Sequence, residues 1–66
     1  SLTDYLSLLE SSDESEELKL SMLDALAWYD ESYRRDEIIA VCDRLRKSAL
    51  SKALKAQAQR TYHRLK

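Results

Sequence analysis

Apolar residues recur along this chain at helical spacing, in four stretches separated by short polar breaks. Residues three or four positions apart share one face of an α-helix, so each stretch predicts an amphipathic helix. The predicted helices span 3–10, 14–29, 34–47 and 51–65. Because the breaks hold only a few residues each, they predict tight turns between antiparallel neighbours. The pattern therefore predicts a single all-α domain over 1–66.

The second predicted helix has two apolar faces, whereas the other three have one stripe each. One face holds Leu18, Met22, Ala25, Leu26 and Tyr29, and the other holds Leu20, Leu23 and Ala27. A helix that is apolar on two sides packs between two layers. The fourth helix is rich in alanine. We expect it to be the last helix of the packed layers, with a polar side that faces solvent. The other stripes are Leu2, Tyr5, Leu6 and Leu9; Ile38, Val41, Cys42 and Leu45; and Leu54, Ala58, Tyr62 and Leu65.

Two of the predicted helices have candidate N-caps. Asp13, followed three residues later by Glu16, resembles a capping box with Asp in place of the usual Ser or Thr. Ser32 is the expected N-cap of the third helix, because a hydroxyl can accept a hydrogen bond from a free N–H of the first turn.

The apolar pattern repeats when the chain is shifted by 36 residues. Residues 2–9 then fall on 38–45, and residues 18–29 fall on 54–65, with apolar positions largely matching apolar positions. A period of about 20 to 50 residues marks stacked repeats, each unable to bury its apolar face alone. Five pairs are identical between residues 1–30 and their shifted positions: Leu9/Leu45, Ser12/Ser48, Ser15/Ser51, Leu18/Leu54 and Lys19/Lys55.

One motif in this pattern resembles a known family. The stretch Leu18-Lys19-x-x-Met22-x-x-Ala25-Leu26 resembles the first helix of a HEAT repeat, which typically reads Val-Arg-x-x-Ala-x-x-Ala-Leu. The matching motifs in the second half are Leu54-Lys55-x-x-Ala58-x-x-Thr61-Tyr62 for a first helix and Ile38-Ile39-Ala40-Val41-Cys42-x-x-Leu45 for a second helix. The resemblance, to HEAT and HEAT-like (phycobilisome-lyase-type) repeats, covers nearly the whole chain. It implies about two α-hairpin repeats of an α-solenoid.

The departures from the HEAT pattern are specific. Met22 stands where a small residue is usual, and Thr61-Tyr62 stands in place of Ala-Leu. A tetratricopeptide pair has less support, because its Trp-x-x-Leu-Gly motif and helix-ending Pro are absent. A free-standing four-helix bundle stays open. The chain begins with Ser1, on the second helix of a unit, which we expect of a piece excised from a longer array.

Composition narrows the classes of protein. With no glycine in the sequence, glycine-rich phosphate loops are excluded. No apolar run is long enough for a transmembrane helix, and no signal-peptide pattern is present, so no membrane partner is expected. A single cysteine, Cys42, cannot form an internal disulfide, which favours a reducing interior such as the cytoplasm.

Charge is divided between the two halves of the chain. Residues 1–33 carry nine acids and one base, whereas residues 34–66 carry ten bases and three acids. In one interpretation, position-equivalent residues of adjacent repeats form ion pairs. In a second, the basic half binds nucleic acid or an acidic protein, and in a third, chains associate end to end. The equivalent pairs of opposite charge are Glu10/Arg46, Glu16/Lys52 and Asp24/Arg60.

Few residues offer chemistry. His63 lies off the apolar stripe and is expected in solvent, whereas Cys42 lies on a stripe and is expected in the core. The acidic run 13–17 suits the positive end of a helix dipole rather than a cation site. The metal-binding spacings His-x-x-x-His and Cys-x-x-Cys do not occur. We therefore expect no catalytic residue, no metal and no cofactor.

Trp28 projects from the polar side of the second predicted helix, and its shifted equivalent is Arg64. This equivalence predicts a cation–π contact across the stack. In a second interpretation, Trp28 is an exposed anchor beside Tyr33, because Trp, Tyr and Arg are enriched at interface hot spots.

These observations predict a non-catalytic helical-repeat scaffold for protein–protein recognition within a larger array. The candidate binding surface is one face of the third helix with two aromatic residues at its edge. It consists of Arg34, Arg35, Arg44 and Lys47, with Trp28 and Tyr33. Nucleic-acid binding by the basic half stays open, and so does a small stand-alone protein of the immunity or antitoxin type.

Overall fold

The computed structural model describes residues 1–49 and 51–66, and over these ranges it contains four α-helices and no strand. They are α1 (Leu2–Glu10), α2 (Glu16–Leu26), α3 (Arg35–Ser48) and α4 (Lys52–Leu65). The all-α prediction is confirmed. Position 50, in the predicted break between the third and fourth helices, lies outside the described residues.

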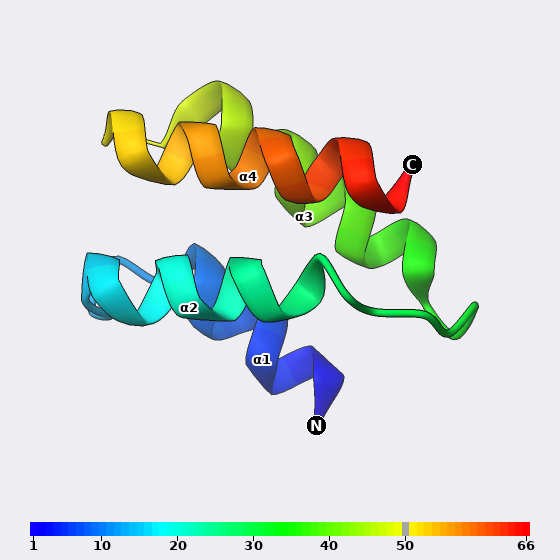
Figure 1. The fold of residues 1–66 in the computed structure, drawn as a ribbon. Helices are drawn as coiled ribbons and strands as arrows, with labels where there is room; N and C mark the ends of the chain where they lie inside the picture. The colour runs from blue at the N-terminus through cyan, green and yellow to red at the C-terminus, as the bar shows by residue number, and fades with distance from the viewer. Residues whose placement is uncertain (50) are drawn as a thin grey trace.

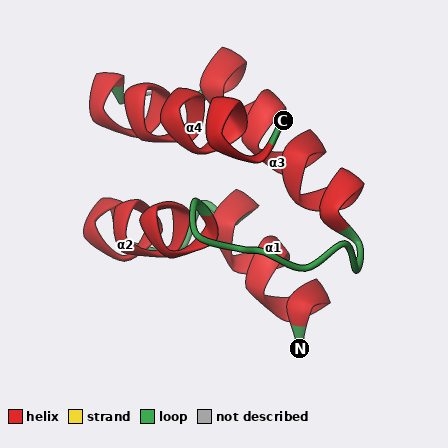
Figure 2. Ribbon diagram, turned by 45° about the vertical axis from the view of Figure 1, so that its right-hand side comes forward, coloured by secondary structure: helices red, strands yellow, loops and turns green. Residues whose placement is uncertain are grey.

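The helices form two layers. One layer holds α1 and α2, and the other holds α3 and α4, as Figure 1 shows. Across the layers α2 contacts α4 and α1 contacts α3, while α3 and α4 contact each other within their layer. The turned view in Figure 2 shows that the longest connection is the one between α2 and α3. The apolar stripes of all four helices therefore meet in one core.

The core follows the predicted stripes closely. Leu9, Leu23, Ile38 and Cys42 are completely buried, and partly buried residues such as Tyr5 pack against them. The remaining buried apolar residues are Leu6, Met22, Leu26, Val41, Leu45, Ala58, Tyr62 and Leu65. The stripes were thus predicted correctly from spacing alone for α1, α3 and α4.

One polar residue is fully buried among these apolar side chains. Thr61 of α4 has no exposed surface, and its Oγ1 donates a hydrogen bond of 2.8 Å to the main-chain carbonyl of Leu23 in α2. A buried hydroxyl without a partner would cost about 1–3 kcal/mol, so this bond offsets the burial and joins the two layers.

The start of α2 differs from the prediction. Its N-cap is Ser15, whose Oγ accepts a hydrogen bond of 3.1 Å from the Leu18 N–H. Asp13 instead donates its own N–H to Ser11 Oγ, so the predicted capping box is wrong. Ser15 caps the helix because it stands directly before the first turn and reaches its third N–H.

The predicted end of α2 at residue 29 is also wrong. The N–H groups of Trp28 and Tyr29 donate to carbonyls three residues back, at Ala25 and Leu26. Hydrogen bonds between residues three positions apart form a tighter turn than the four-residue bonds of an α-helix. The α-helix therefore ends at Leu26.

The start of α3 differs as well. Its N-cap is Arg34 rather than Ser32, and Arg34 makes no side-chain cap bond. With φ of 53°, Arg34 has the left-handed conformation that is uncommon outside glycine. Its carbonyl accepts hydrogen bonds from the N–H groups of Glu37 and Ile38, and the Ser32 carbonyl accepts from the Arg35 N–H. Main-chain carbonyls thus accept the hydrogen bonds at the start of this helix, where the sequence predicted a serine hydroxyl as the acceptor.

Candidate functional site

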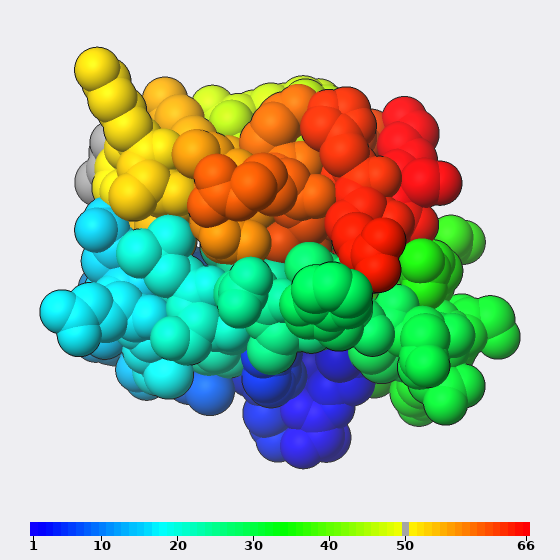
Figure 3. All heavy atoms as spheres, viewed as in Figure 1, coloured from blue at the N-terminus to red at the C-terminus, as the bar shows by residue number. Residues whose placement is uncertain are grey.

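Trp28 lies in the turn directly after α2, and 70% of its surface is exposed. The guanidinium carbon of Arg64, from the last turn of α4, lies 4.6 Å from the centroid of its ring. In Figure 3 the red end of α4 accordingly reaches down onto the green end of α2. The predicted cation–π contact across the layers is confirmed, and most of the indole stays available to solvent.

A hollow of about 480 Å³ lies beside Trp28, where α2 ends, α3 begins and α4 ends. We call it the corner hollow. Arg35 donates from Nε to the Leu65 carbonyl at 3.2 Å, and from Nη1 to the Tyr29 carbonyl at 3.0 Å and the Glu31 carbonyl at 3.3 Å. Arg35 therefore ties the connection between α2 and α3 to the C-terminal end of α4. The hollow is lined by Ala27, Trp28, Tyr29, Asp30, Glu31, Ser32, Arg35 and Arg64.

Tyr33 and Arg34 stand together at the start of α3. Tyr33 is 66% exposed, and its carbonyl accepts a hydrogen bond of 2.6 Å from the Tyr29 hydroxyl. The Arg34 guanidinium lies 5.9 Å from the Tyr33 ring and forms an ion pair of 2.6 Å with Glu37. The Glu37 hydrogen bond raises the pKa of Arg34. The charge of Arg34 is thus balanced within its own helix.

Arg44 pairs with Glu10 across the layers. The bond is bidentate, with Nε donating to Oε2 at 2.9 Å and Nη2 donating to Oε1 at 2.8 Å. The hydrogen bond from Arg44 lowers the pKa of Glu10. The predicted Glu10/Arg46 pair is wrong, because Arg46 turns toward α4 instead. The predicted pairs Glu16/Lys52 and Asp24/Arg60 do not form within the described part of the chain.

A groove of about 280 Å³ runs between α1 and α3 and includes two of the predicted basic residues, Arg34 and Arg44. Each of these arginines is bonded to a carboxylate that also lines the groove, Glu37 or Glu10. The groove therefore carries both signs of charge rather than a continuous basic surface. Its lining is Thr3, Leu6, Ser7, Glu10, Arg34, Glu37, Ala40, Val41 and Arg44.

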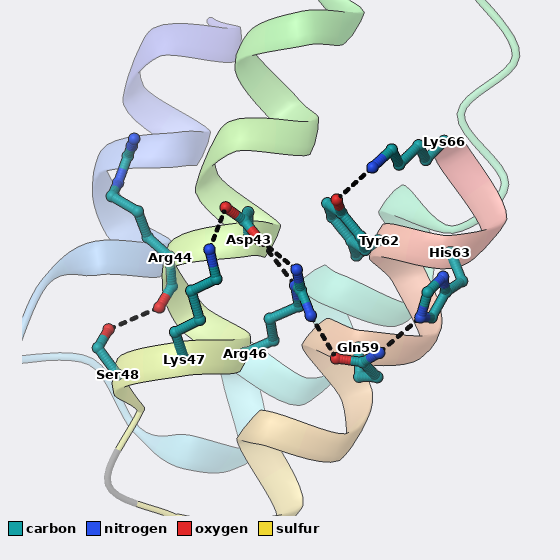
Figure 4. Close-up of polar contacts among 9 residues, drawn as sticks. All are labelled: Asp43, Arg44, Arg46, Lys47, Ser48, Gln59, Tyr62, His63 and Lys66. Atoms are coloured by element: carbon teal, nitrogen blue, oxygen red, sulfur yellow. Dashed lines mark hydrogen bonds and ion pairs between the residues drawn. The ribbon is translucent and has the colours of Figure 1, made fainter.

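Lys47, the last predicted basic residue, belongs to a polar network on the outer side of the α3/α4 layer. Asp43 accepts from Lys47 at 3.1 Å and from Arg46 at 2.7 Å, as Figure 4 shows. The Lys47 hydrogen bond, followed by that of Arg46, lowers the pKa of Asp43. Arg46 also donates to the Gln59 amide oxygen at 3.1 Å.

The same network continues along α4. Gln59 is in hydrogen-bond contact with His63, and Lys66 donates to the Tyr62 hydroxyl at 2.8 Å, which lowers the pKa of Tyr62. The Arg46 guanidinium lies 4.1 Å from the centroid of the Tyr62 ring. We call this surface the polar outer face, consisting of Asp43, Arg46, Gln59, His63 and Lys66. Most of its polar groups bind one another.

The opposite side of the molecule is apolar, and sequence reasoning missed it. Leu8 of α1 and Leu18 of α2 are 40% and 41% exposed. A shallow hollow of about 370 Å³ lies in the same layer, between α1 and the C-terminal end of α2. It is lined by Ser1, Leu2, Tyr5, Ala25, Leu26 and Tyr29. The Tyr5 hydroxyl donates to the Met22 carbonyl at 2.9 Å and so holds the two helices together.

Helical geometry places these side chains on the outside of their layer. Leu18 and Ala25 share one face of α2, at a spacing of seven, and Tyr29 lines the hollow together with Ala25. Leu23 lies about 140° away around this helix, and its carbonyl bonds to α4. Leu8 lies about 160° away from Glu10, which reaches α3. We call this surface the apolar outer face, consisting of Leu2, Tyr5, Leu8, Leu18, Ala25 and Tyr29.

A signal for this face was present in the sequence. The second predicted helix has two apolar faces, which indicates packing on two sides. The structure covers the face that holds Leu23, through α4, and leaves part of the other face in solvent. That face is divided, since Met22 and Leu26 are buried whereas Leu18 and Ala25 are exposed.

The side chains that could take part in catalysis or bind a metal do not lie together. Cys42 is fully buried, as predicted, and burial raises the pKa of its thiol to about 11, which suppresses the reactive thiolate. His63 is exposed, as predicted, and contacts Gln59. Within residues 1–49 and 51–66, no three side chains of His, Cys, Asp or Glu gather where they could hold a metal ion.

None of the helices in the described ranges has the length and apolar character needed to cross a membrane. No family model matches this chain, and neither a curated protein nor a solved structure does.

Proposed function

We propose that this chain is a non-catalytic helical-repeat module of about two HEAT-like α-hairpin units and that it recognises another protein. The shift of 36 residues relates positions with the same structural role, which supports the repeat. Ser15 and Ser51 are both N-caps, and each accepts a hydrogen bond of 3.1 Å from the third residue after it. Leu9 and Leu45 are both buried.

The packing of the layers agrees with this proposal. In a stack of repeats, equivalent helices lie next to each other. Here α2 contacts its equivalent α4, and α1 contacts its equivalent α3. The equivalent residues Trp28 and Arg64 also touch. A hydrogen bond from the Thr61 hydroxyl to the Leu23 carbonyl also joins α2 to α4.

The observation that carries protein recognition is the apolar outer face. Two leucines that are 40% and 41% exposed and an apolar hollow lie in the same layer of a small domain. Isolated exposed leucines are common, but a contiguous apolar patch marks an interaction surface. Within a longer array this face would contact the adjoining repeat, and in isolation it is open to a partner.

The six residues predicted as a binding surface differ in how free their side chains are to contact a partner. Trp28, which lines the corner hollow, and Tyr33 both keep exposed rings and are suited to contacts at the edge of an interface. Arg34, Arg44 and Lys47 are each in an ion pair with a carboxylate. Arg35 is bonded to three main-chain carbonyls. Contacts by these four would require the present bonds to break.

Nucleic-acid binding has weaker support than protein recognition. Such proteins use clustered lysines and arginines that are free to contact phosphates. In the groove between α1 and α3, the two arginines face Glu37 and Glu10. An immunity- or antitoxin-like role would be a special case of protein recognition, with a single tight partner. A buried free thiol at Cys42 suits the reducing cytoplasm.

The test is fluorescence anisotropy with two kinds of probe, a set of labelled amphipathic helical peptides of differing charge and a labelled random DNA duplex. We expect saturable binding of at least one peptide that survives physiological salt, and no binding of the duplex under the same conditions. Binding of the duplex alone, with steep loss on adding salt, would replace protein recognition by nucleic-acid recognition.

A further inference from the structure

The apolar outer face has a covered counterpart inside the molecule. When its six residues are shifted by 36 positions, every one falls in the α3/α4 layer on the side that contacts the α1/α2 layer. The shifted positions are Ile38, Val41, Arg44, Leu54, Thr61 and Leu65. The chain therefore repeats most of this apolar pattern, once against helices and once open, with Arg44 in place of Leu8 and Thr61 in place of Ala25.

The covered copy shows how such a surface binds helices. Ile38, Val41 and Leu65 are buried in the core shared by the layers. Thr61 reaches across to α2 through its hydrogen bond, and Arg44 reaches across to α1 through its ion pair with Glu10. Apolar packing in the middle, one hydrogen bond and one ion pair hold the two layers together.

We propose that the apolar outer face binds an amphipathic helix of a separate partner protein and that this helix carries lysines or arginines beside its apolar stripe. The inference rests on the proposed function and adds the chemical character of the partner. The central contacts would match those of the covered copy: an apolar ridge entering the hollow lined by Leu2, Tyr5 and Ala25, and packing on Leu18.

The sign of the partner's charge follows from the acids of this layer. Residues 1–33 hold nine acids and one base, Lys19, whose Nζ donates to the Ser11 carbonyl. Asp4 lies one turn before Leu8, and its side chain is 83% exposed. Asp24 and Glu16 of α2 are exposed as well. These exposed carboxylates make the α1/α2 layer acidic, so a basic partner is complementary to it.

A second copy of this chain fits the open face poorly. Stacked end to end, the copy would present its polar outer face, placing Gln59 and His63 against exposed leucines. Such contact would bury polar groups without new partners, at a cost of about 1–3 kcal/mol each. Stacked face to face, two acidic layers would repel each other. Polarity therefore argues against end-to-end stacking, and charge argues against face-to-face stacking.

Titration calorimetry with three synthetic helices tests the proposal. Each helix has the 14-residue length of α4. One carries a leucine stripe flanked by lysines, the second has glutamate for every lysine, and the third has glutamine for every leucine. We expect only the first to bind, and we expect Leu18→Glu to weaken its binding by about tenfold or more, as the loss of an interface anchor does.

The matched control is Ala56→Glu, which adds the same charge at an exposed position of α4. It should leave the affinity nearly unchanged. The double variant Asp4→Lys with Asp24→Lys should reduce binding of the lysine helix and create binding of the glutamate helix. Circular dichroism on each variant verifies that the helices still form.

The outcomes separate this inference from the proposed function. Equal binding of the lysine and glutamate helices overturns the assignment of charge, and unchanged binding by the Leu18→Glu variant overturns the assignment of the surface. In both cases protein recognition would stand. Failure of all three helices, together with a dimer in sedimentation equilibrium that Leu18→Glu dissociates, would identify a second copy as the occupant. Failure of all three helices without a dimer would contradict the inference, and absence of binding across the wider peptide set would contradict protein recognition itself.

Discussion

The α1/α2 layer and the α3/α4 layer share one apolar pattern, yet they expose opposite surfaces. The outer side of α3/α4 is the polar outer face, where Asp43, Arg46 and Gln59 bind one another. The outer side of α1/α2 is the apolar outer face, with Leu8 and Leu18 about two-fifths exposed. The pattern that builds the core is therefore repeated, whereas the chemistry of the outer sides is not.

This difference suits the outer sides of the two layers to different contacts. A terminal repeat needs a polar outer side, because an apolar one would remain in water. The α3/α4 layer has a polar outer side because α4 carries polar residues at certain positions. The equivalent positions of α2 are the ones that face α4. Gln59 occupies the position equivalent to Leu23, and His63 that of Ala27. Two differences within the repeated pattern thus give α4 a polar side where α2 has an apolar one.

The largest expected effect comes from one repeat position tested in both layers. Ile38, completely buried, is the equivalent of Leu2, which is only partly buried. Ile38→Ala should lower the free energy of unfolding by about 2–5 kcal/mol, and Leu2→Ala by about 1 kcal/mol or less. Urea denaturation followed by circular dichroism measures both. Should Ile38→Ala fail to fold, Ile38→Val, with an expected loss of about 0.5–1.5 kcal/mol, provides the comparison. Equal losses at both positions would mean that the layers are covered alike.

A second pair tests the hydrogen bond between the layers. Thr61→Val removes the bond to the Leu23 carbonyl, which keeps the Ala27 N–H as a partner, so we expect a loss of about 1 kcal/mol. The equivalent residue is Ala25, in the exposed face of α2. Ala25→Thr should cost about 0.5 kcal/mol through helix propensity alone, since no helix lies opposite it. A stabilising Ala25→Thr would show that this face already has a partner.

The cation–π contact should contribute less. Arg64→Ala removes the guanidinium that lies 4.6 Å from the Trp28 ring, with an expected loss of about 0.5–1 kcal/mol. Because Trp28 is the sole tryptophan, its emission reports on this contact directly. We expect a shift of the emission maximum in Arg64→Ala and none in Arg60→Ala, in the same helix. Identical spectra would mean that the ring is free of α4 in solution.

The smallest expected effect is the pH dependence of the Glu10 ion pair. The hydrogen bond from Arg44 lowers the pKa of Glu10 below its unfolded value of about 4.3, so the pair stabilises the fold above that pH. This stabilisation is lost as the pH falls through the lower folded pKa. Because the pair is partly exposed, the contribution should be below about 1 kcal/mol.

Urea denaturation at pH about 7 and about 3 measures this loss. Glu10→Gln should reduce the change in stability between the two conditions. Asp43, whose pKa is also lowered, titrates in the same direction, so the variant comparison is what isolates Glu10. Glu17→Gln removes an exposed carboxylate from α2 and serves as the control. An equal reduction by both variants would attribute the effect to net charge.

Spacing in the sequence was sufficient for the core of the molecule. The stripe of Ile38, Val41 and Cys42 was predicted from its period, and all three residues are buried. The contact of Trp28 with Arg64 followed from the repeat, because equivalent residues of stacked helices lie side by side. Such predictions succeed because they depend only on helix geometry and on burial of apolar surface.

Details that depend on local competition were not predictable in this way. Ser15 and Asp13 are both good caps, and only the conformation of the connection decides which one begins α2. The partner of Glu10 depends on how far two long side chains reach and on what else attracts them. Arg46 is drawn to Asp43, Gln59 and Tyr62, which leaves Arg44 for Glu10. The apolar outer face was missed because a second apolar stripe was assumed to be covered.

The most direct test of the difference between the layers is amide chemical-shift mapping of the whole chain during titration with the lysine-flanked leucine helix. We expect the largest shifts at Tyr5, Leu8, Leu18 and Ala25, on the apolar outer face. The amides of Gln59 and His63, on the polar outer face, should stay in place. Shifts concentrated on the polar outer face, or spread over the basic residues of α3, would contradict the account.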